Sequence, residues 1–74
     1  MKYLRDDTFL IKIGLKLREL RKQKGFTQEI LANEVGVEIS QISRIERGVL
    51  NTSISLVNAI SKVLGISIKD LFDF

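Results

Sequence analysis

The feature that most constrains the fold is the run of residues 28–47, which reads QEILANEVGVEISQISRIER. It holds a small residue at Ala32 and a glycine at Gly36, with apolar residues around both. Gly36 suits the left-handed backbone conformation that ends a helix, and a residue as small as Ala32 lets a neighbouring backbone approach. Ile42 and Ile45, three residues apart, turn one face of a second helix inward. The run therefore predicts two short helices that cross steeply through a tight turn.

The outward face of that second helix carries side chains suited to a DNA groove. These are Ile39, Ser40, Gln41, Ser43 and Arg44. Hydroxyl, amide and guanidinium groups hydrogen bond to base edges in the major groove, and an apolar side chain can pack on a thymine methyl group. The residues thus favour a DNA-binding helix-turn-helix.

Blocks on both sides of this run make the interpretation more specific. They read LRELRKQKGFTQ at 17–28, ISRIERG at 42–48 and VLGIS at 63–67. In this order and spacing, from about Ile13 to Phe72, the chain resembles the phage-repressor-like helix-turn-helix family, also called the Cro or xenobiotic-response-element type. Small relatives of this kind include controller proteins of restriction–modification systems, antitoxins and phage-type repressors.

Strand signals are absent, and the pattern of glycines and caps predicts an all-α fold. We expect one domain over residues 1–74, with a short leader at 1–7 and a helical core at 8–72. Five helices are expected, at about 8–24, 28–35, 39–47, 54–64 and 68–72, and the second and third form the helix-turn-helix. The fold class is therefore a compact five-helix, repressor-like DNA-binding domain.

Short polar side chains mark where these helices begin. The expected caps are, in chain order, Asp7 or Thr8, Thr27, Thr52 or Ser53, and Ser67 with Asp70 as a capping box. Residues at helical spacing should pack inward. They are Phe9, Ile13, Leu17 and Leu20 in the first helix and Ile54, Val57, Ile60 and Leu64 in the fourth.

Composition excludes some sites and leaves the partner open. With no cysteine and no histidine, the chain has no disulfide, no thiolate metal site and no histidine base. No apolar run is long enough to span a membrane and no signal-peptide layout is present, so we expect a cytoplasmic protein without a membrane partner, cofactor or small-molecule effector. The net charge of +3 mildly favours a polyanion. Residues 12–24 are basic but residues 28–47 lean acidic, so charge alone does not decide.

The family resemblance implies base contacts by Ile39, Ser40 and Arg44. In well-known relatives the first of these positions holds a hydrogen-bonding residue, often glutamine; an isoleucine can contact only apolar groups, such as the thymine methyl. Arg44 lies one turn beyond Ser40 on the same face and suits a bidentate pair with guanine. The alternatives are a core position for Ile39, a helix cap for Ser40, and a phosphate contact or solvated side chain for Arg44.

Other polar residues are expected to contact the DNA backbone. Gln28, the first residue of its helix, should meet a phosphate with its side chain and its backbone N–H, and in relatives the matching glutamine also braces the start of the recognition helix. Asn51 could instead stabilise the turn after the third helix. The expected set is Thr27, Gln28, Gln41, Ser43, Arg47, Asn51 and Thr52.

Arg21 and Glu46 are interpreted as structural, because the family often pairs these positions in a largely buried ion pair that joins the first helix to the third. We assign neither to catalysis. An enzyme is the least favoured class, since the chain shows no nucleophile–base constellation.

One domain with three or four base-reading side chains cannot single out one genomic site, so we expect a homodimer on double-stranded DNA with an inverted-repeat operator. Its seam is expected from Leu56, Val63, Ile68, Phe72 and Phe74, unless all five pack within one copy. The predicted function is a sequence-specific transcriptional regulator, repressor or activator. The alternative is a protein-interaction module or antitoxin of the same fold, which the acidic balance of residues 28–47 favours.

Overall fold

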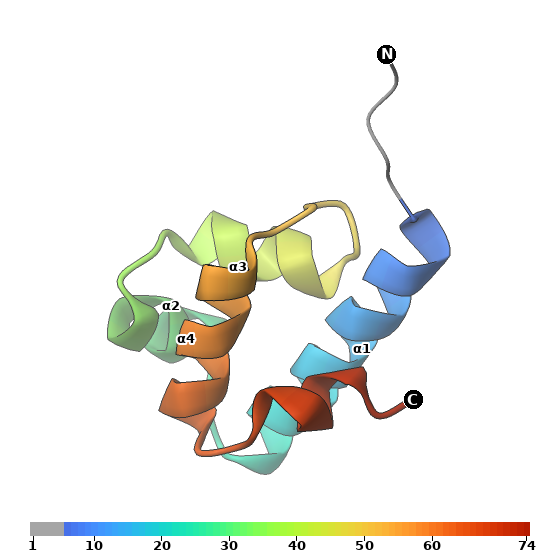
Figure 1. The fold of residues 1–74 in the computed structure, drawn as a ribbon. Helices are drawn as coiled ribbons and strands as arrows, with labels where there is room; N and C mark the ends of the chain where they lie inside the picture. Colours follow the sequence, from blue (N-terminus) through green and yellow to red (C-terminus); the bar gives the residue numbers. More distant parts are fainter. Residues whose placement is uncertain (1–5) are drawn as a thin grey trace.

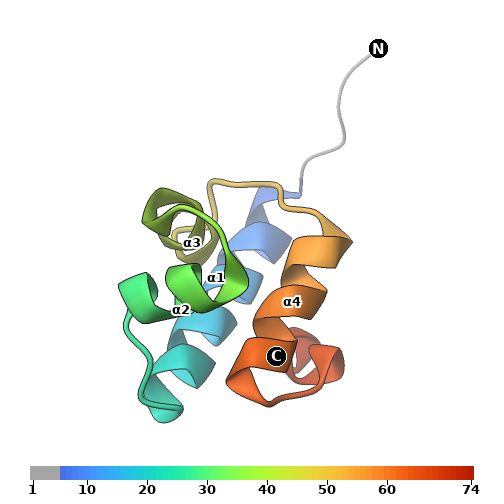
Figure 2. The ribbon, with the colours of Figure 1, turned by 90° about the vertical axis from the view of Figure 1, so that its left-hand side faces the viewer.

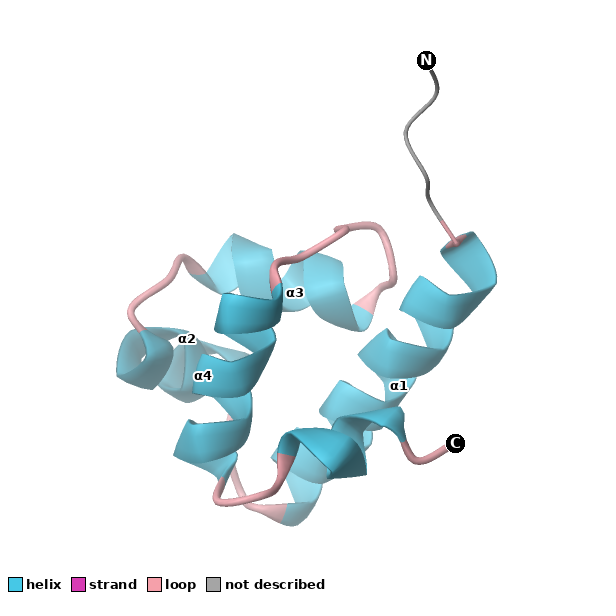
Figure 3. Cartoon of the chain, in the orientation of Figure 1, coloured by secondary structure: helices cyan, strands magenta, loops and turns pink. Residues whose placement is uncertain are grey.

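The computed structural model describes residues 6–74, which form four α-helices and one short 3₁₀ helix. Their bounds are α1 Asp7–Gln23, α2 Gln28–Val35, α3 Ile39–Glu46, α4 Ile54–Leu64 and η1 Ile68–Phe72. Within this range no strand occurs, and loops alone join the helices (Figure 3). The all-α fold is confirmed.

The expected count of five α-helices is wrong, because the last segment is a 3₁₀ helix. The Asp70 N–H donates to the Ser67 carbonyl at 3.0 Å, which is the i to i+3 pattern of a 3₁₀ turn. The capping box expected at these two residues is present, and one of its bonds runs from the Ser67 N–H to Asp70 Oδ2 at 3.0 Å. Five residues that end in an exposed tail do not extend to a full α-helix.

Caps explain where the other helices start. Asp6 caps α1, since its Oδ1 accepts the Phe9 N–H at 3.0 Å, so the expectation of Asp7 or Thr8 is wrong. The leader expected at 1–7 therefore ends one residue earlier, and its first five residues lie outside the described range. Thr27 caps α2 as expected, and Ser53 rather than Thr52 caps α4. α1 and α3 each end one residue before their expected limits.

Packing centres on α3. α1 and α2 both pack against α3, α2 also packs against α4, and η1 packs against α1 and α4. In Figures 1 and 2, α3 lies near the top of the molecule and the 47–53 loop carries the chain over to α4. The core is filled by side chains from every element, namely Leu17, Leu31, Ile42, Ile60 and Leu71.

Two residues expected to pack inward do not. Phe9 is 41% exposed and Ile54 is 68% exposed. Both lie in the first turn of their helices, before Ile13 and Val57, which are the first buried apolar residues of α1 and α4.

Among the described helices, none combines the length and apolar character needed to cross a bilayer.

Candidate nucleic-acid interface

A tight turn joins α2 to α3 and fixes the start of α3. Gly36 has a φ of 88°, the left-handed conformation expected for it. The carbonyl of Ala32 accepts two N–H groups, from Gly36 at 2.8 Å and from Val37 at 3.0 Å. Ala32 itself is buried. The helix-turn-helix predicted over residues 28–47 is therefore present.

The two faces of α3 differ as the sequence predicts. Ile42 and Ile45 are buried at 0% and 3% exposure. Ile39, Ser40 and Arg44 are all exposed, so Ile39 is not a core residue. The N-cap of α3 is Glu38, and Ser40 lies two positions inside the helix. These three side chains therefore share a surface that a ligand could approach.

Several residues expected at the DNA backbone already make contacts within the chain. Thr27 Oγ1 accepts the Ile30 N–H at 3.0 Å, and Gln41 Oε1 accepts the Glu38 N–H at 3.2 Å. Both bonds use an oxygen as acceptor. The Thr27 hydroxyl and the Gln41 amide therefore keep their donor hydrogens, which is what a phosphate requires.

Gln28 lies at the first position of α2 but does not brace the start of α3. Its Nε2 donates to Glu46 Oε1 at 3.0 Å, and Glu46 is the last residue of α3. One amide hydrogen and the backbone N–H of Gln28 remain for an anion.

The remaining backbone candidates lie at the end of α3 and in the loop that follows. Arg47 Nε donates to the Ser43 carbonyl at 3.4 Å, so the arginine folds back along α3. In the loop, Asn51 is exposed and Thr52 is half-buried. Both loop residues also line a cavity behind the loop.

Arg21 and Glu46 form a bidentate ion pair between α1 and α3. Arg21 Nε lies 2.6 Å from Glu46 Oε2, and Arg21 Nη2 lies 3.1 Å from Oε1. Both residues are buried, at 7% and 6% exposure. Arg21 Nη1 also donates to the Phe26 carbonyl at 2.8 Å. With Gln28, this network ties α1, α2 and α3 together behind the exposed face of α3.

The residues expected at a dimer seam fall into two groups. Leu56, Val63 and Ile68 are half-buried and pack against the core. Phe72 and Phe74 are 38% and 55% exposed. They gather around Phe9, which the sequence predicted in the core and not at a seam; its ring lies 6.0 Å from that of Phe72 and 5.8 Å from that of Phe74.

Polar groups on this surface are suited to recognition. Within residues 6–74, no three acidic side chains come together in a way that could hold a metal ion. Among the described residues, every buried side-chain nitrogen and oxygen has a hydrogen-bond partner. The exposed hydroxyl, amide and guanidinium groups of α3 and its flanking loops are of the kinds that hydrogen bond to bases and phosphates.

Comparison with known proteins agrees with this arrangement. A helix-turn-helix family model matches residues 17–71. The control protein C.BamHI of Bacillus amyloliquefaciens is 45% identical over 62 residues, which cover 82% of this chain and 76% of that protein. The crystal structure of the restriction–modification controller protein C.AhdI from Aeromonas hydrophila matches with a TM-score of 0.83 at 40% identity, over 85% of this chain and 96% of that one. That of SinR, the master regulator for biofilm formation, in complex with DNA, matches with a TM-score of 0.77 at 39% identity, over 82% of this chain and 98% of that one.

The family match spans more than half of the chain and includes α2, the turn and α3. The resemblance drawn from the sequence, including that to restriction–modification controller proteins, is thereby confirmed. The chain belongs to the helix-turn-helix family of DNA-binding transcriptional regulators.

Proposed function

We propose that this regulator binds its operator as a homodimer, with α3 of each copy in the major groove. The observation that carries the proposal is the exposed row of Ile39, Ser40 and Arg44 on a helix held from behind by the buried pair of Arg21 and Glu46. A helix fixed in this way can present base-reading groups in one orientation, which reduces the entropy lost on binding.

Each side chain of this row suits a different group of the DNA. The Arg44 side chain forms no hydrogen bond or ion pair with the described residues, so its guanidinium can pair with guanine O6 and N7. Ile39 suits a thymine methyl group. The Ser40 hydroxyl can donate to or accept from a base edge, which makes it the least selective of the three.

Groups around this row suit contacts with phosphates on both sides of the groove. Before α3 they are the Thr27 hydroxyl and the α2 N-terminus at Gln28, where helix N–H groups favour an anion. Gln41 and Ser43 lie on α3 itself. After α3, Arg47, Asn51 and Thr52 could follow the backbone further. Such contacts set register and carry little sequence information.

A homodimer would double these contacts on an inverted repeat and place the two α3 helices about 34 Å apart on one face of DNA. We assign its seam to the exposed Phe72 and Phe74, together with the half-buried Leu56, Val63 and Ile68. Because a regulator of this kind must reach chromosomal DNA, we place it in the cytoplasm. We propose that it acts as a repressor or an activator and has no catalytic activity.

A protein-interaction module or antitoxin is the second candidate. Its support is the exposed acidic set of Glu29, Glu34 and Glu38 on α2 and the turn, which lies beside the proposed DNA surface and would repel phosphates that come close.

Selection of bound sequences from a random-oligonucleotide pool tests the DNA proposal. We expect an inverted repeat with half-sites about one helical turn apart, bound with an affinity that falls as salt rises. Gel shifts with the selected operator and a scrambled operator supply the control. Enrichment of no sequence, together with equal affinity for both duplexes, would favour the protein-interaction module.

A further inference from the structure

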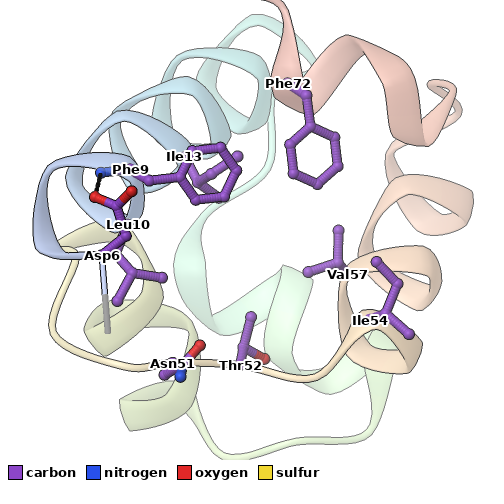
Figure 4. Close-up of a pocket in the computed structure, with 9 residues that line it drawn as sticks. All are labelled: Asp6, Phe9, Leu10, Ile13, Asn51, Thr52, Ile54, Val57 and Phe72. Atoms are coloured by element: carbon purple, nitrogen blue, oxygen red, sulfur yellow. Dashed lines mark hydrogen bonds between the residues drawn. The ribbon is translucent and has the colours of Figure 1, made fainter. Parts of the chain in front are cut away.

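A cavity of about 340 Å³ lies behind the 47–53 loop and shares only Asn51 and Thr52 with the proposed DNA surface. Its walls come from α1, α4 and η1 (Figure 4). The apolar wall residues include Phe9 and Ile13 on α1, Ile54 and Val57 on α4, and Phe72 on η1. A volume of this size is at the lower end of the range for small-molecule sites, about 300–1,000 Å³.

The polar groups of the cavity are few. Asn51 and Thr52 from the loop form one edge of it, and the Asp6 carboxylate lies at the start of α1, where it accepts the Phe9 N–H (Figure 4). Asp6 is the only charged side chain among the described lining residues. A carboxylate repels an anion and attracts a cation. The cavity therefore combines two phenyl rings with a single carboxylate, which disfavours an anionic ligand.

We propose that this cavity binds a small, neutral or cationic aromatic molecule, and that its occupancy adjusts the affinity for DNA. The regulatory part rests on the proposed function, since Asn51 and Thr52 would contact phosphate on one side and the ligand on the other. If the ligand moves this loop, it binds the DNA-bound protein and the free protein with different affinities. The affinity for DNA then changes by the same factor when the ligand is bound. No effector was expected from the sequence, because the lining residues come from four separate segments.

A second copy of the chain is the competing occupant, because Phe72 also belongs to the proposed seam. The geometry favours a small molecule. Phe9 and Phe72 stack with a centroid distance of 6.0 Å and an interplanar angle of 16°, so the two rings already cover one another along this wall. Three elements of one copy line the space, which is open on one side, and a flat protein surface would cover its mouth without filling it.

Three probes of one shape and different charge test the ligand class, namely tryptamine, indole and indole-3-acetate. Titrations followed by ¹H–¹⁵N NMR should show tryptamine and indole shifting the amides of Phe9, Thr52 and Val57 with dissociation constants of about 1 mM or tighter. Indole-3-acetate should bind several-fold more weakly than tryptamine. If no probe shifts these amides, or if the anion binds best, the proposal is wrong.

Two variants locate the site. Phe72→Ala removes a wall and should weaken tryptamine binding by about tenfold. Phe74→Ala is the matched control, since Phe74 contacts Phe9 but does not line this cavity. Asp6→Asn keeps a good helix cap and should bring the affinities for tryptamine and indole-3-acetate together. Equal losses in Phe72→Ala and Phe74→Ala, or an unchanged charge preference in Asp6→Asn, would overturn the assignment.

Two further measurements test whether a second copy of the chain fills the cavity and whether the ligand regulates DNA binding. Tryptamine affinity should not depend on protein concentration; a decline as the protein associates would show that a second copy fills the cavity and would refute the proposal. Saturating tryptamine should change the affinity for the selected operator at least about threefold, and an unchanged affinity would refute the regulatory part. If no DNA binds at all, the proposed function fails while the titrations still decide whether the cavity is a ligand site.

Discussion

Gly14 of α1 lies directly against the backbone of α3 at Ile45. A Cβ atom added at Gly14 would stand 2.4 Å from the carbonyl oxygen of Ile45 and 2.6 Å from that of Glu46. Both contacts are shorter than a carbon and an oxygen can approach without displacement. Because the opposing atoms are backbone, no rotamer change relieves them. The position of α3 on the domain therefore depends on the absence of a side chain at Gly14.

We expect Gly14→Ala to lower the free energy of unfolding by at least about 2 kcal/mol, although alanine is the better helix former. Gly25→Ala is the matched control, because Gly25 has a φ of 78° but no atom within 4 Å of the added Cβ, so its cost should be about 1 kcal/mol of backbone strain. Urea denaturation of both variants measures the difference. A Gly14→Ala protein as stable as the wild type would show that the two helices can separate without loss.

The sequence predicted the elements of this fold better than their contacts. The bounds of α2 and α4 were correct, because a hydroxyl cap precedes each helix and a glycine with positive φ follows it. Gly14 gave no such signal, since a glycine within a helix reveals neither its neighbour nor the distance. The exposed positions of Phe9 and Ile54 were also missed, because a helical stripe does not indicate where the core ends.

The same limit applies to the candidate site. The exposed face of α3 followed from the burial of Ile42 and Ile45, which a period of 3.6 residues predicts. The bond between Gln28 and Glu46 joins residues 18 positions apart. Local pattern cannot reveal it, since it depends on how α2 and α3 pack.

Removing one partner of the Arg21–Glu46 ion pair should lower the free energy of unfolding strongly, whereas replacing both partners by apolar residues should lower it little. Arg21→Ala leaves a buried carboxylate with only Gln28 as partner, and we expect a loss of about 3–5 kcal/mol in unfolding free energy. The double variant Arg21→Met, Glu46→Leu removes both charges and should recover most of that loss. Thermal unfolding of the single and double variants provides the test. A double variant no more stable than Arg21→Ala would mean that the hydrogen bonds to Phe26 and Gln28 matter more than the charges.

Arg44→Ala should reduce sequence preference and leave the fold intact. We expect the operator to be bound more weakly by about 1–3 kcal/mol while a scrambled duplex is bound nearly as before. Arg18→Ala is the control, since Arg18 is also an exposed arginine but lies on α1, and it should change neither value by more than a fraction of that amount. The assignment of Arg44 to base readout fails if its variant keeps the wild-type preference.

Ile39 allows a chemical test of thymine recognition. Replacing one operator thymine at a time with uracil removes only the methyl group, and at one position this should weaken wild-type binding by about 1 kcal/mol. In Ile39→Ala the same replacement should have a much smaller effect, because the partner of the methyl group is already absent. Fluorescence anisotropy with both proteins and both duplexes completes the cycle. Equal effects of uracil in the two proteins would place Ile39 away from the base.

The last prediction concerns assembly through Phe72 and Phe74. Their rings are exposed and cluster with Phe9, and such an apolar patch favours association. We expect the wild type to dimerise at about tens of micromolar in sedimentation equilibrium, and the double variant Phe72→Ala, Phe74→Ala to remain folded but monomeric.

Ile30→Ala serves as the control for that experiment. Ile30 is 47% exposed on α2, so its loss removes a comparable apolar side chain from a different surface and should leave the dimer unchanged. A wild type that stays monomeric in this range would contradict the homodimer itself. If the double variant dimerises as well as the wild type, the seam lies elsewhere, and the half-buried Leu56 and Val63 on α4 are then the residues to change next.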